Sequence, residues 1–313
     1  MSNNHNSYQG GILAPASSNA LFITLNRDPL KCQPVKSLLK QVSQLPNYLF
    51  ELQKAYPEAE LYLTLALSSD FWDFLEILPK PKQLQGFKAI HNQQVSMPAT
   101  DADMILHIRS QRHDINYLLA LRLFEQLTPA MQLDEMVHGF KYLDSRDLTG
   151  FVDGTENPEG KEREQVAIVA NDAPFNGGSY LHLQKYQHQL NDWQALSLKQ
   201  QEDSYGRTKA ENIEYPAAQK SQCAHTKRTS IKDLQGKGIE ILRHSLPFGD
   251  LNQSGLLFAS YGASPESFNL MLESMCQLDE NSATDSILRV TSAVSGHAFF
   301  APNLDWFKQF QNS

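Results

Sequence analysis

The sequence predicts an α+β fold built from two ferredoxin-like units, whose antiparallel sheets pack together and leave the helices on the outside. The main observation is an order of elements, strand–helix–strand and then strand–helix, that occurs twice with an offset of about 150 residues. That order builds an antiparallel sheet with helices on one face. The length of 313 residues is also enough for two units that each bury a core. We place these units at residues 1–150 and 151–313.

In the first half, short apolar runs predict strands, and apolar residues at helical spacing predict helices. The predicted strands are Leu21–Leu25, Leu61–Leu67 and Asp103–Ser110, with a further candidate at Phe140–Leu143. The predicted helices are Val35–Tyr56, Ser68–Leu78 and Asp114–Leu127. Pro46 could break or end the first helix, because proline has no amide donor. Residues 1–19 are polar and rich in Asn, Ser and Gly, so we expect them to be extended or loose.

In the second half the same rules predict the strands Ser179–Leu183, Gly238–Arg243 and Gly255–Tyr261. They also predict the helices Asp192–Ser204 and Pro265–Gln277. Two Met side chains on the second helix, Met271 and Met275, lie on an apolar stripe that we expect to face the core. Polar inserts at Gly154–Val166 and Gly206–Thr229 have no counterpart in the first half. Functional residues are often carried on such loops.

The charge balance argues against a nucleic-acid partner. The net charge is −8, from 27 Lys and Arg against 35 Asp and Glu, whereas nucleic-acid binders concentrate positive charge. A hydrophobic content of 41% and a charged content of 20% are typical of an ordinary globular protein. No apolar run approaches the roughly 20 residues that cross a bilayer, so we expect no membrane partner.

The cysteines predict a reducing compartment. Cys32, Cys223 and Cys276 are odd in number and far apart, which fits neither a disulfide framework nor a thiolate metal site. We expect them to be small buried residues. The N-terminus lacks a basic start followed by an apolar core, so it does not predict a signal peptide. The expected location is the cytoplasm.

The stretch Gly150–Pro158, GFVDGTENP, is the first candidate for a functional site. It places Asp153 and Glu156 among residues that favour irregular backbone. The apolar pair before Asp153 should be buried and would carry this acid inward. A carboxylate close to an apolar interior must be paired, hydrogen-bonded or chemically useful. The pattern alone leaves a functional site and an elaborate turn both open.

Two further candidates lie downstream. His225 stands in QCAHTKRT within the second insert, and Arg243 ends the predicted strand in GIEILRHSLPFG. Taken singly, one of ten histidines is more often structural or solvent-facing than a ligand. In the same way, Arg243 could be an ordinary charge at a strand end.

Taken together, these stretches resemble the dye-decolorising haem peroxidases, most closely the compact bacterial cytoplasmic subgroup. The resemblance rests on GFVDGTENP, on AHTKR at Ala224–Arg228 and on RHSLPFG at Arg243–Gly249. Supporting stretches are GRTK at Gly206–Lys209, GLLFASY at Gly255–Tyr261 and TSAVSGHAFFAP at Thr291–Pro302. All lie in family order between about Gly11 and Trp306. The resemblance implies two ferredoxin-like halves with haem b in the C-terminal half, in agreement with the duplication.

The resemblance also implies a role for each matching residue. His225 would be the proximal ligand of the haem iron, and Asp285 would fix the tautomer of its imidazole, with Asp279 and Glu280 as nearby competitors for that role. Asp153 and Arg243 would be catalytic residues on the distal face. The other expected cofactor contacts are Arg207 and Arg228 near the propionates, together with Gly154, Thr155, Glu156, Phe258 and Ser245.

Two positions need comment, and so does the end of the sequence. Ser245 occupies a place that is often Asn in relatives, and its hydroxyl can donate to peroxide or water with a shorter reach. His244 is a titratable group close to the site without an expected role. The sequence ends soon after FFAPNLDWF, without the extended tail by which some relatives are packed into protein shells. We therefore do not expect such cargo behaviour.

The implied activity is the oxidation of dyes, phenols or other small one-electron donors by H2O2, in a homo-oligomer that is a dimer or larger. Asp153 would move a proton between the peroxide oxygens if it is ionised, while Arg243 would stabilise developing negative charge. Arg243 lowers the pKa of Asp153 and burial raises it, and the sequence leaves open which effect is larger.

The expected pocket is closed by Phe151 and Phe258 and would exclude bulky donors. Their electrons could leave through surface aromatics, for which the tryptophans Trp72, Trp193 and Trp306 are candidates. Ordinary packing is the alternative for each of them.

Two other functions remain open at this point. A protein that stores, delivers or dismantles haem would use the same His225 and show peroxidase activity incidentally. A duplicated fold without a cofactor could serve as an interaction or small-ligand module. The first alternative is distinguished by a slow reaction with peroxide, and the second by the absence of a haem band after reconstitution.

Overall fold

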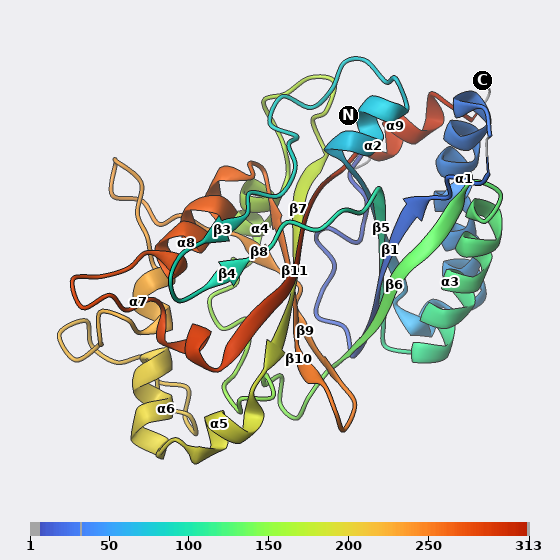
Figure 1. Cartoon of the computed structure of the whole chain (residues 1–313). Helices are drawn as coiled ribbons and strands as arrows, with labels where there is room; N and C mark the ends of the chain where they lie inside the picture. The colour runs from blue at the N-terminus through green and yellow to red at the C-terminus, as the bar shows by residue number, and fades with distance from the viewer. Residues whose placement is uncertain (1–6, 32, 312–313) are drawn as a thin grey trace.

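The computed structural model describes residues 7–31 and 33–311. Figure 1 shows the strands between two groups of helices. The main strands of the first half are β1 (Asn19–Arg27), β2 (Tyr62–Ser68), β5 (Met104–Ser110) and β6 (Met131–Phe140). Its helices are α1 (Val35–Ala55), α2 (Ser69–Phe74) and α3 (His113–Leu127). The short elements are η1 (Pro57–Ala59), β3 (Ile90–His91) and β4 (Ser96–Met97).

The second half repeats this order with longer connections. Its strands are β7 (Ser179–His188), β8 (Leu242–Arg243), β9 (Leu246–Gly249), β10 (Ser254–Gly262) and β11 (Thr291–Ala301). Its helices begin with α4 (Lys161–Ala167), α5 (Leu190–Ala195), α6 (Leu198–Tyr205) and α7 (His225–Thr229). They continue with α8 (Glu266–Cys276), η2 (Ser286–Arg289) and α9 (Leu304–Lys308).

The strands of both halves join into one antiparallel sheet. Their order is β6-β1-β5-β2-β11-β7-β10-β8, and β9 also pairs with β10. The central strands are β1 and β5 in the first half and β7 and β10 in the second, as expected for ferredoxin-like units. The halves meet where β2 pairs with β11 through Phe299–Ser68 and Phe300–Leu67.

Besides this edge contact, an apolar core lies between the inner faces of the strands of the two halves. Successive strand residues point to opposite sides of a sheet, so Phe22 of β1 packs with Leu183 and Tyr261 of the second half. Leu21 and Ile23 point the other way, toward α1 and α3. On the far side, α8 covers the outer face of the second half, as Figure 1 shows. The predicted fold class, with packed sheets and outer helices, is confirmed.

Helix α1 continues through Pro46, so the predicted interruption is wrong. Proline inside a helix costs about 3 kcal/mol. Here the helix keeps a long buried face that includes Leu38, Val42 and Leu49. Tertiary packing of such a face supplies most of the stability of a helix in a protein and outweighs this cost.

Several predicted boundaries in the sheet also differ. The strand expected at Phe140–Leu143 is β6, Met131–Phe140, an edge strand with many exposed residues and therefore a weak apolar pattern. The strand expected at Gly238–Arg243 is reduced to Leu242–Arg243, because residues 238–241 line a cavity.

Two predicted helices are shorter than expected. The helix predicted at Asp192–Ser204 is two helices, because Ser197 begins α6 with a capping box completed by Gln200. The helix predicted at Ser68–Leu78 ends at Phe74, and Glu76 then takes a positive φ of 54°.

The described part of the N-terminal segment is packed rather than loose. Ile12 and Ala14 are buried, and the Gln9 side chain hydrogen-bonds with Leu65 and Pro302. Residues 1–6 and Cys32 lie outside the described residues. Cys223 and Cys276 are buried free thiols, as predicted. Among the described helices, none is both long and apolar enough to cross a membrane. The division at residue 150 stays a prediction.

The buried His182 of β7 gives a testable pH dependence of stability. It stacks on Phe268 with ring centroids 4.1 Å apart, and burial lowers its pKa from 6.5 to about 3. Unfolding restores the ordinary pKa, so stability is full above about pH 6.5 and is lost as pH falls toward 3. At about pH 4.5, protonation of the unfolded chain should cost about 3 kcal/mol at this one site.

We expect His182→Phe to lose less free energy of unfolding than wild type between neutral and acidic pH, as measured by urea unfolding. His91→Phe, at an exposed position, is the matched control and should show the wild-type dependence of the free energy of unfolding on pH. An equal pH dependence of the free energy of unfolding in wild type and His182→Phe would contradict the assignment of this loss to His182.

Candidate active site

The second half of the chain encloses a cavity whose wall contains six of the predicted site residues. The wall is built from residues 147–156, α7, the chain before β8, β10 and α8. The six residues are Phe151, Asp153, Glu156, His225, Arg243 and Phe258. They come from distant parts of the sequence, so the fold brings them together.

His225 is held by the acid that the resemblance selects. Its Nδ1 lies 2.7 Å from Oδ2 of Asp285, whose side chain is fully buried and whose Oδ1 accepts from the amide of Ile287. The competitor Asp279 accepts from Cys223 and from its own loop, and Glu280 is exposed. The second imidazole nitrogen, Nε2, has no partner among the described residues. A ring oriented in this way presents one free nitrogen to the cavity.

The loop that carries Asp153 is fixed by its backbone. Gly150 and Gly154 take positive φ values of 88° and 75°, a region that L side chains rarely adopt. The Asp153 amide donates to the carbonyl of Ser145 at 3.0 Å. The apolar Phe151 is buried and stacks on Tyr205, as the sequence pattern predicts. The loop therefore sets the direction of the Asp153 side chain.

Asn157 connects this loop to the strand that bears Arg243. Its Nδ2 donates to the Arg243 carbonyl at 2.9 Å, and its Oδ1 accepts from the Arg243 amide at 2.8 Å. The Nε of Arg243 is buried without a partner among the described residues. The last residues of GFVDGTENP thus hold Asp153 and Arg243 in a fixed relation.

Burial raises the pKa of Asp153. Loss of solvent raises the pKa of this carboxyl, and nearby Asp147 raises it further, while Arg243 lowers it. Desolvation is the largest effect, and the pKa lies above the ordinary value of 3.8. The question left open by the sequence is therefore answered in favour of burial.

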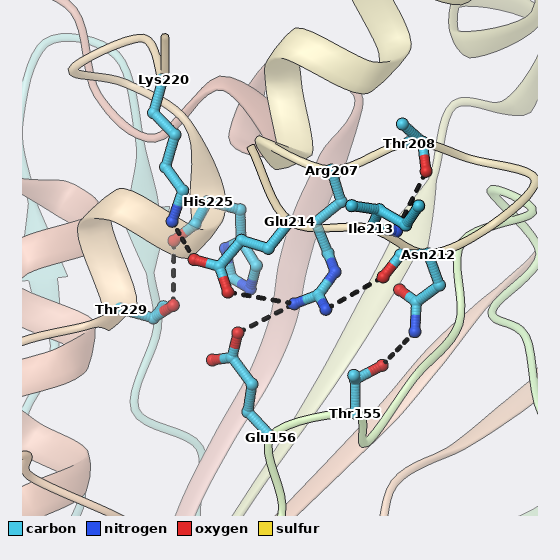
Figure 2. A network of polar contacts seen from close by, with 10 residues as sticks. All are labelled: Thr155, Glu156, Arg207, Thr208, Asn212, Ile213, Glu214, Lys220, His225 and Thr229. Atoms are coloured by element: carbon cyan, nitrogen blue, oxygen red, sulfur yellow. Dashed lines mark hydrogen bonds and ion pairs between the residues drawn. The ribbon is translucent and has the colours of Figure 1, made fainter. Parts of the chain in front are cut away.

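Arg207 pairs with Glu156, which lines the cavity, and Figure 2 shows its contacts. Its Nη1 lies 2.8 Å from Oε1 of Glu156 and 3.9 Å from Oε2 of Glu214. Its Nη2 donates to the Asn212 carbonyl, while Nε is buried without a partner among the described residues. Thr155 accepts from the Asn212 side chain at 2.9 Å. Glu156 thus connects Arg207 to the cavity wall.

Five of the predicted cofactor contacts do not line this cavity, namely Arg207, Arg228, Gly154, Thr155 and Ser245. The guanidinium of Arg228 instead donates to the carbonyls of Ser274, Gln277 and Ala283. Thr155 faces Asn212 instead. Gly154 and Ser245 line a second cavity, which Asp153 and Arg243 also border.

His244 and the tryptophans have structural surroundings. The Nε2 of His244 donates to the buried carbonyl of Ile12, and burial holds its pKa well below 6.5, so this side chain is neutral. Trp72, Trp193 and Trp306 are all buried. None of the three is a surface aromatic.

A buried polar cluster in the same cavity was not found from the sequence. His188 Nε2 contacts Asp147 Oδ1 at 3.1 Å, and its Nδ1 contacts Thr291 at 2.8 Å. The other oxygen of Asp147 accepts from Thr149, whose hydroxyl meets that of Tyr205 at 3.0 Å. Asp147 lies three residues before GFVDGTENP, and this closeness to the motif is the sequence feature that could have indicated it. His188 had no distinguishing motif.

The Met stripe of α8 was assigned to the core alone. Met271 and Met275 do pack in the outer core of the second half, but both also line the cavity. Together with Phe258 and Leu272 they form an apolar wall.

The fold thus brings a free imidazole nitrogen, a carboxylate and a guanidinium to the wall of one largely apolar cavity. The sequence matches the profile "Dyp-type peroxidase, N-terminal" over residues 9–141 and "Dyp-type peroxidase, C-terminal" over residues 144–306. The chain belongs to the Dyp-type peroxidase family, a family of oxidoreductases that act on peroxide.

Relatives support this assignment over almost the whole chain. The dye-decolorizing peroxidase of Mycolicibacterium paratuberculosis is 37% identical over 298 residues, which cover 94% of this chain and 83% of the relative. A dye-decolorizing protein from V. cholerae is 35% identical, with a TM-score of 0.88 over 96% of this chain and 99% of that one. A DypB variant from Rhodococcus jostii, solved in complex with heme, is 32% identical, with a TM-score of 0.91 over 97% and 98%.

Proposed function

We propose that this protein is a haem peroxidase that uses H2O2 to oxidise dyes, phenols or other small one-electron donors. The observation that carries the proposal is the His225–Asp285 pair, which leaves one imidazole nitrogen free toward the cavity. This arrangement suits an axial ligand of haem iron. The heme-bound Rhodococcus jostii relative supports haem b as the cofactor.

The residues around the cavity fit this cofactor. Apolar side chains from β10 and α8, including Phe258 and Leu272, would pack on a flat macrocycle. Beside the cavity, Arg207 would bind a haem propionate, and its unpaired Nε could donate a hydrogen bond to it. The neighbouring Glu156 already partly neutralises this guanidinium, so we expect it to tune the contact. Gly154, Thr155 and Ser245 would act through the loop and the second cavity.

The distal chemistry belongs to Asp153 and Arg243. Bound haem would supply the metal centre at which peroxide is cleaved. Asp153 would accept a proton from one peroxide oxygen and return it to the other, directly or through water. Arg243 would stabilise the negative charge that develops as the O–O bond breaks, and its unpaired Nε is available for this. Asn157 would keep both groups at fixed positions.

The proposal also includes the subgroup, the cellular location and the oligomeric state of the protein. The compact bacterial subgroup is supported by the motifs quoted above. A cytoplasmic location is supported by the free thiols of Cys223 and Cys276. We also propose that the protein forms a homo-oligomer, as the family resemblance implies.

The test is the pH dependence of the haem-loaded enzyme. The proton shuttle needs ionised Asp153, and burial raises the pKa of this group above 3.8. We therefore expect the rate constant for reaction with H2O2 to fall as pH decreases through the Asp153 pKa. The Asp153→Asn variant should lack this acidic limb. Stopped-flow mixing with H2O2 across pH, beside steady-state assays with a phenol and an anthraquinone dye, measures it.

A slow reaction with H2O2 at every pH, in a protein that binds haem stoichiometrically, would contradict the peroxidase proposal. It would favour a role in handling haem instead. An acidic limb that persists unchanged in Asp153→Asn would assign the limb to another group.

A further inference from the structure

A second cavity lies on the other side of Asp153 and Arg243, and it is strongly cationic. Its volume is about 330 Å³, near the lower end of the range for small-molecule sites. The two halves of the chain both contribute to its wall. Its basic residues are Arg109, Lys141, Arg146, Arg163 and Arg243, against the single acid Asp153.

Most of this positive charge is not neutralised by the protein. Arg146 pairs with Asp144 at 2.8 Å. Within the described part of the chain, no carboxylate lies within ion-pair distance of Arg109, Lys141, Arg163 or Arg243. The net charge on the wall therefore favours an anion.

Arg109 is a buried cation without an ion-pair partner among the described residues. Arg109 is 3% exposed, and the neighbouring Tyr62 and Tyr261 carry hydroxyls rather than carboxylates. Its guanidinium donates to the Gly11 carbonyl at 2.9 Å, which leaves further donors in the fork. A buried guanidinium without a counter-charge is costly unless something else satisfies it. The second guanidinium, Arg163, donates to the carbonyls of Leu13 and Ala14.

The shape of the wall selects among anions. H2O2 is neutral and gives no reason for the three cations Arg109, Lys141 and Arg163, which have no ion-pair partner among the described residues. The planar guanidinium forks match a carboxylate, while Tyr142, Leu246 and Pro247 offer contact to a small organic body. We propose that this second cavity binds a small organic carboxylate, held by Arg109, Lys141 and Arg163 beside the distal residues. The inference does not depend on the haem cavity, because these three side chains do not line it.

The test is equilibrium binding of benzoate by isothermal titration calorimetry, with the full-length haem-loaded protein at low ionic strength. Benzamide is the neutral control of the same shape. We expect benzoate to bind saturably and benzamide at least about tenfold more weakly, since a charge-assisted hydrogen bond is worth about that factor or more.

Variants locate the site. Lys141→Gln and Arg163→Gln should each weaken benzoate binding about tenfold, whereas Arg163→Lys keeps the charge and should recover much of the affinity. Lys40→Gln and Arg122→Gln, on the outer helices α1 and α3, are the matched controls and should leave the affinity unchanged. Absence of saturable benzoate binding, equal binding of benzamide, or wild-type affinity in Lys141→Gln and Arg163→Gln would each overturn the proposal. Unchanged thermal midpoints show that the variants are folded.

Discussion

Replacing His225 by alanine is expected to abolish stable haem binding. The imidazole is the candidate iron ligand, and its free nitrogen follows from the 2.7 Å contact between Nδ1 and Asp285. The variant should lose nearly all Soret absorbance per protein after reconstitution. Because a partner of a metal ligand typically contributes 10–100-fold to affinity, Asp285→Asn should weaken haem binding by about that factor while retaining the band at high haem concentration.

His188→Gln is the matched control for His225→Ala. His188 also lines the cavity, but both of its ring nitrogens are occupied by Asp147 and Thr291. We expect this variant to keep its haem. Retention of the wild-type Soret absorbance in His225→Ala would contradict the proximal assignment, and loss of haem in His188→Gln alone would transfer it to His188.

The variants Asp153→Asn and Arg243→Leu are expected to keep haem and to react slowly with peroxide. Removal of a positioned proton shuttle typically costs about 10²–10⁴ in rate, and removal of one stabilising donor about 10²–10³. Stopped-flow mixing of the ferric protein with H2O2 gives the rate constant directly. Burial raises the pKa of Asp153, so ionisation of this group lowers the stability of the folded protein above that pKa, and the haem-free Asp153→Asn protein should unfold at no lower temperature than wild type near neutral pH. The rate loss would then be chemical rather than structural.

Asp147→Asn separates a specific role of Asp153 from a general effect of negative charge. Asp147 is a second buried acid on the same wall, but its oxygens are engaged by His188 and Thr149. We expect a smaller rate loss for this variant than for Asp153→Asn. Wild-type rate constants in both Asp153→Asn and Arg243→Leu would refute the distal assignment. A rate loss in Asp147→Asn equal to that in Asp153→Asn would assign the effect to electrostatics.

The duplicated architecture could be predicted because it depends on patterns that are local in sequence. Alternating or continuous apolar runs marked β1, β2, β5, β7 and β10, since their side chains pack on a core. The edge strand β6 escaped prediction, as many of its residues are exposed. Pro46 led to a predicted interruption of α1 that the structure does not show, because the apolar face of this helix is stabilised by packing on the sheet.

The candidate site was predictable to the extent that motifs carry it. GFVDGTENP, AHTKR, RHSLPFG and GLLFASY named six residues that the structure places on one cavity wall. Arg228 does not line this cavity, because a position close to His225 on a single helical turn does not fix the direction of a long side chain. In the structure that side chain points to carbonyl groups at the end of α8 and in the following loop.

Composition, order of elements and motifs thus set the fold class, the family and the identities of the main site residues. The three-dimensional arrangement alone decided the direction in which the pKa of Asp153 shifts, because burial raises it more than Arg243 lowers it. It also revealed that Asn157 joins the Asp153 loop to Arg243. Behind them, three cations without an ion-pair partner among the described residues, Arg109, Lys141 and Arg163, line one cavity. Electrostatic energies depend on distances through space and on local solvent, and neither quantity is encoded in the spacing of residues along the chain.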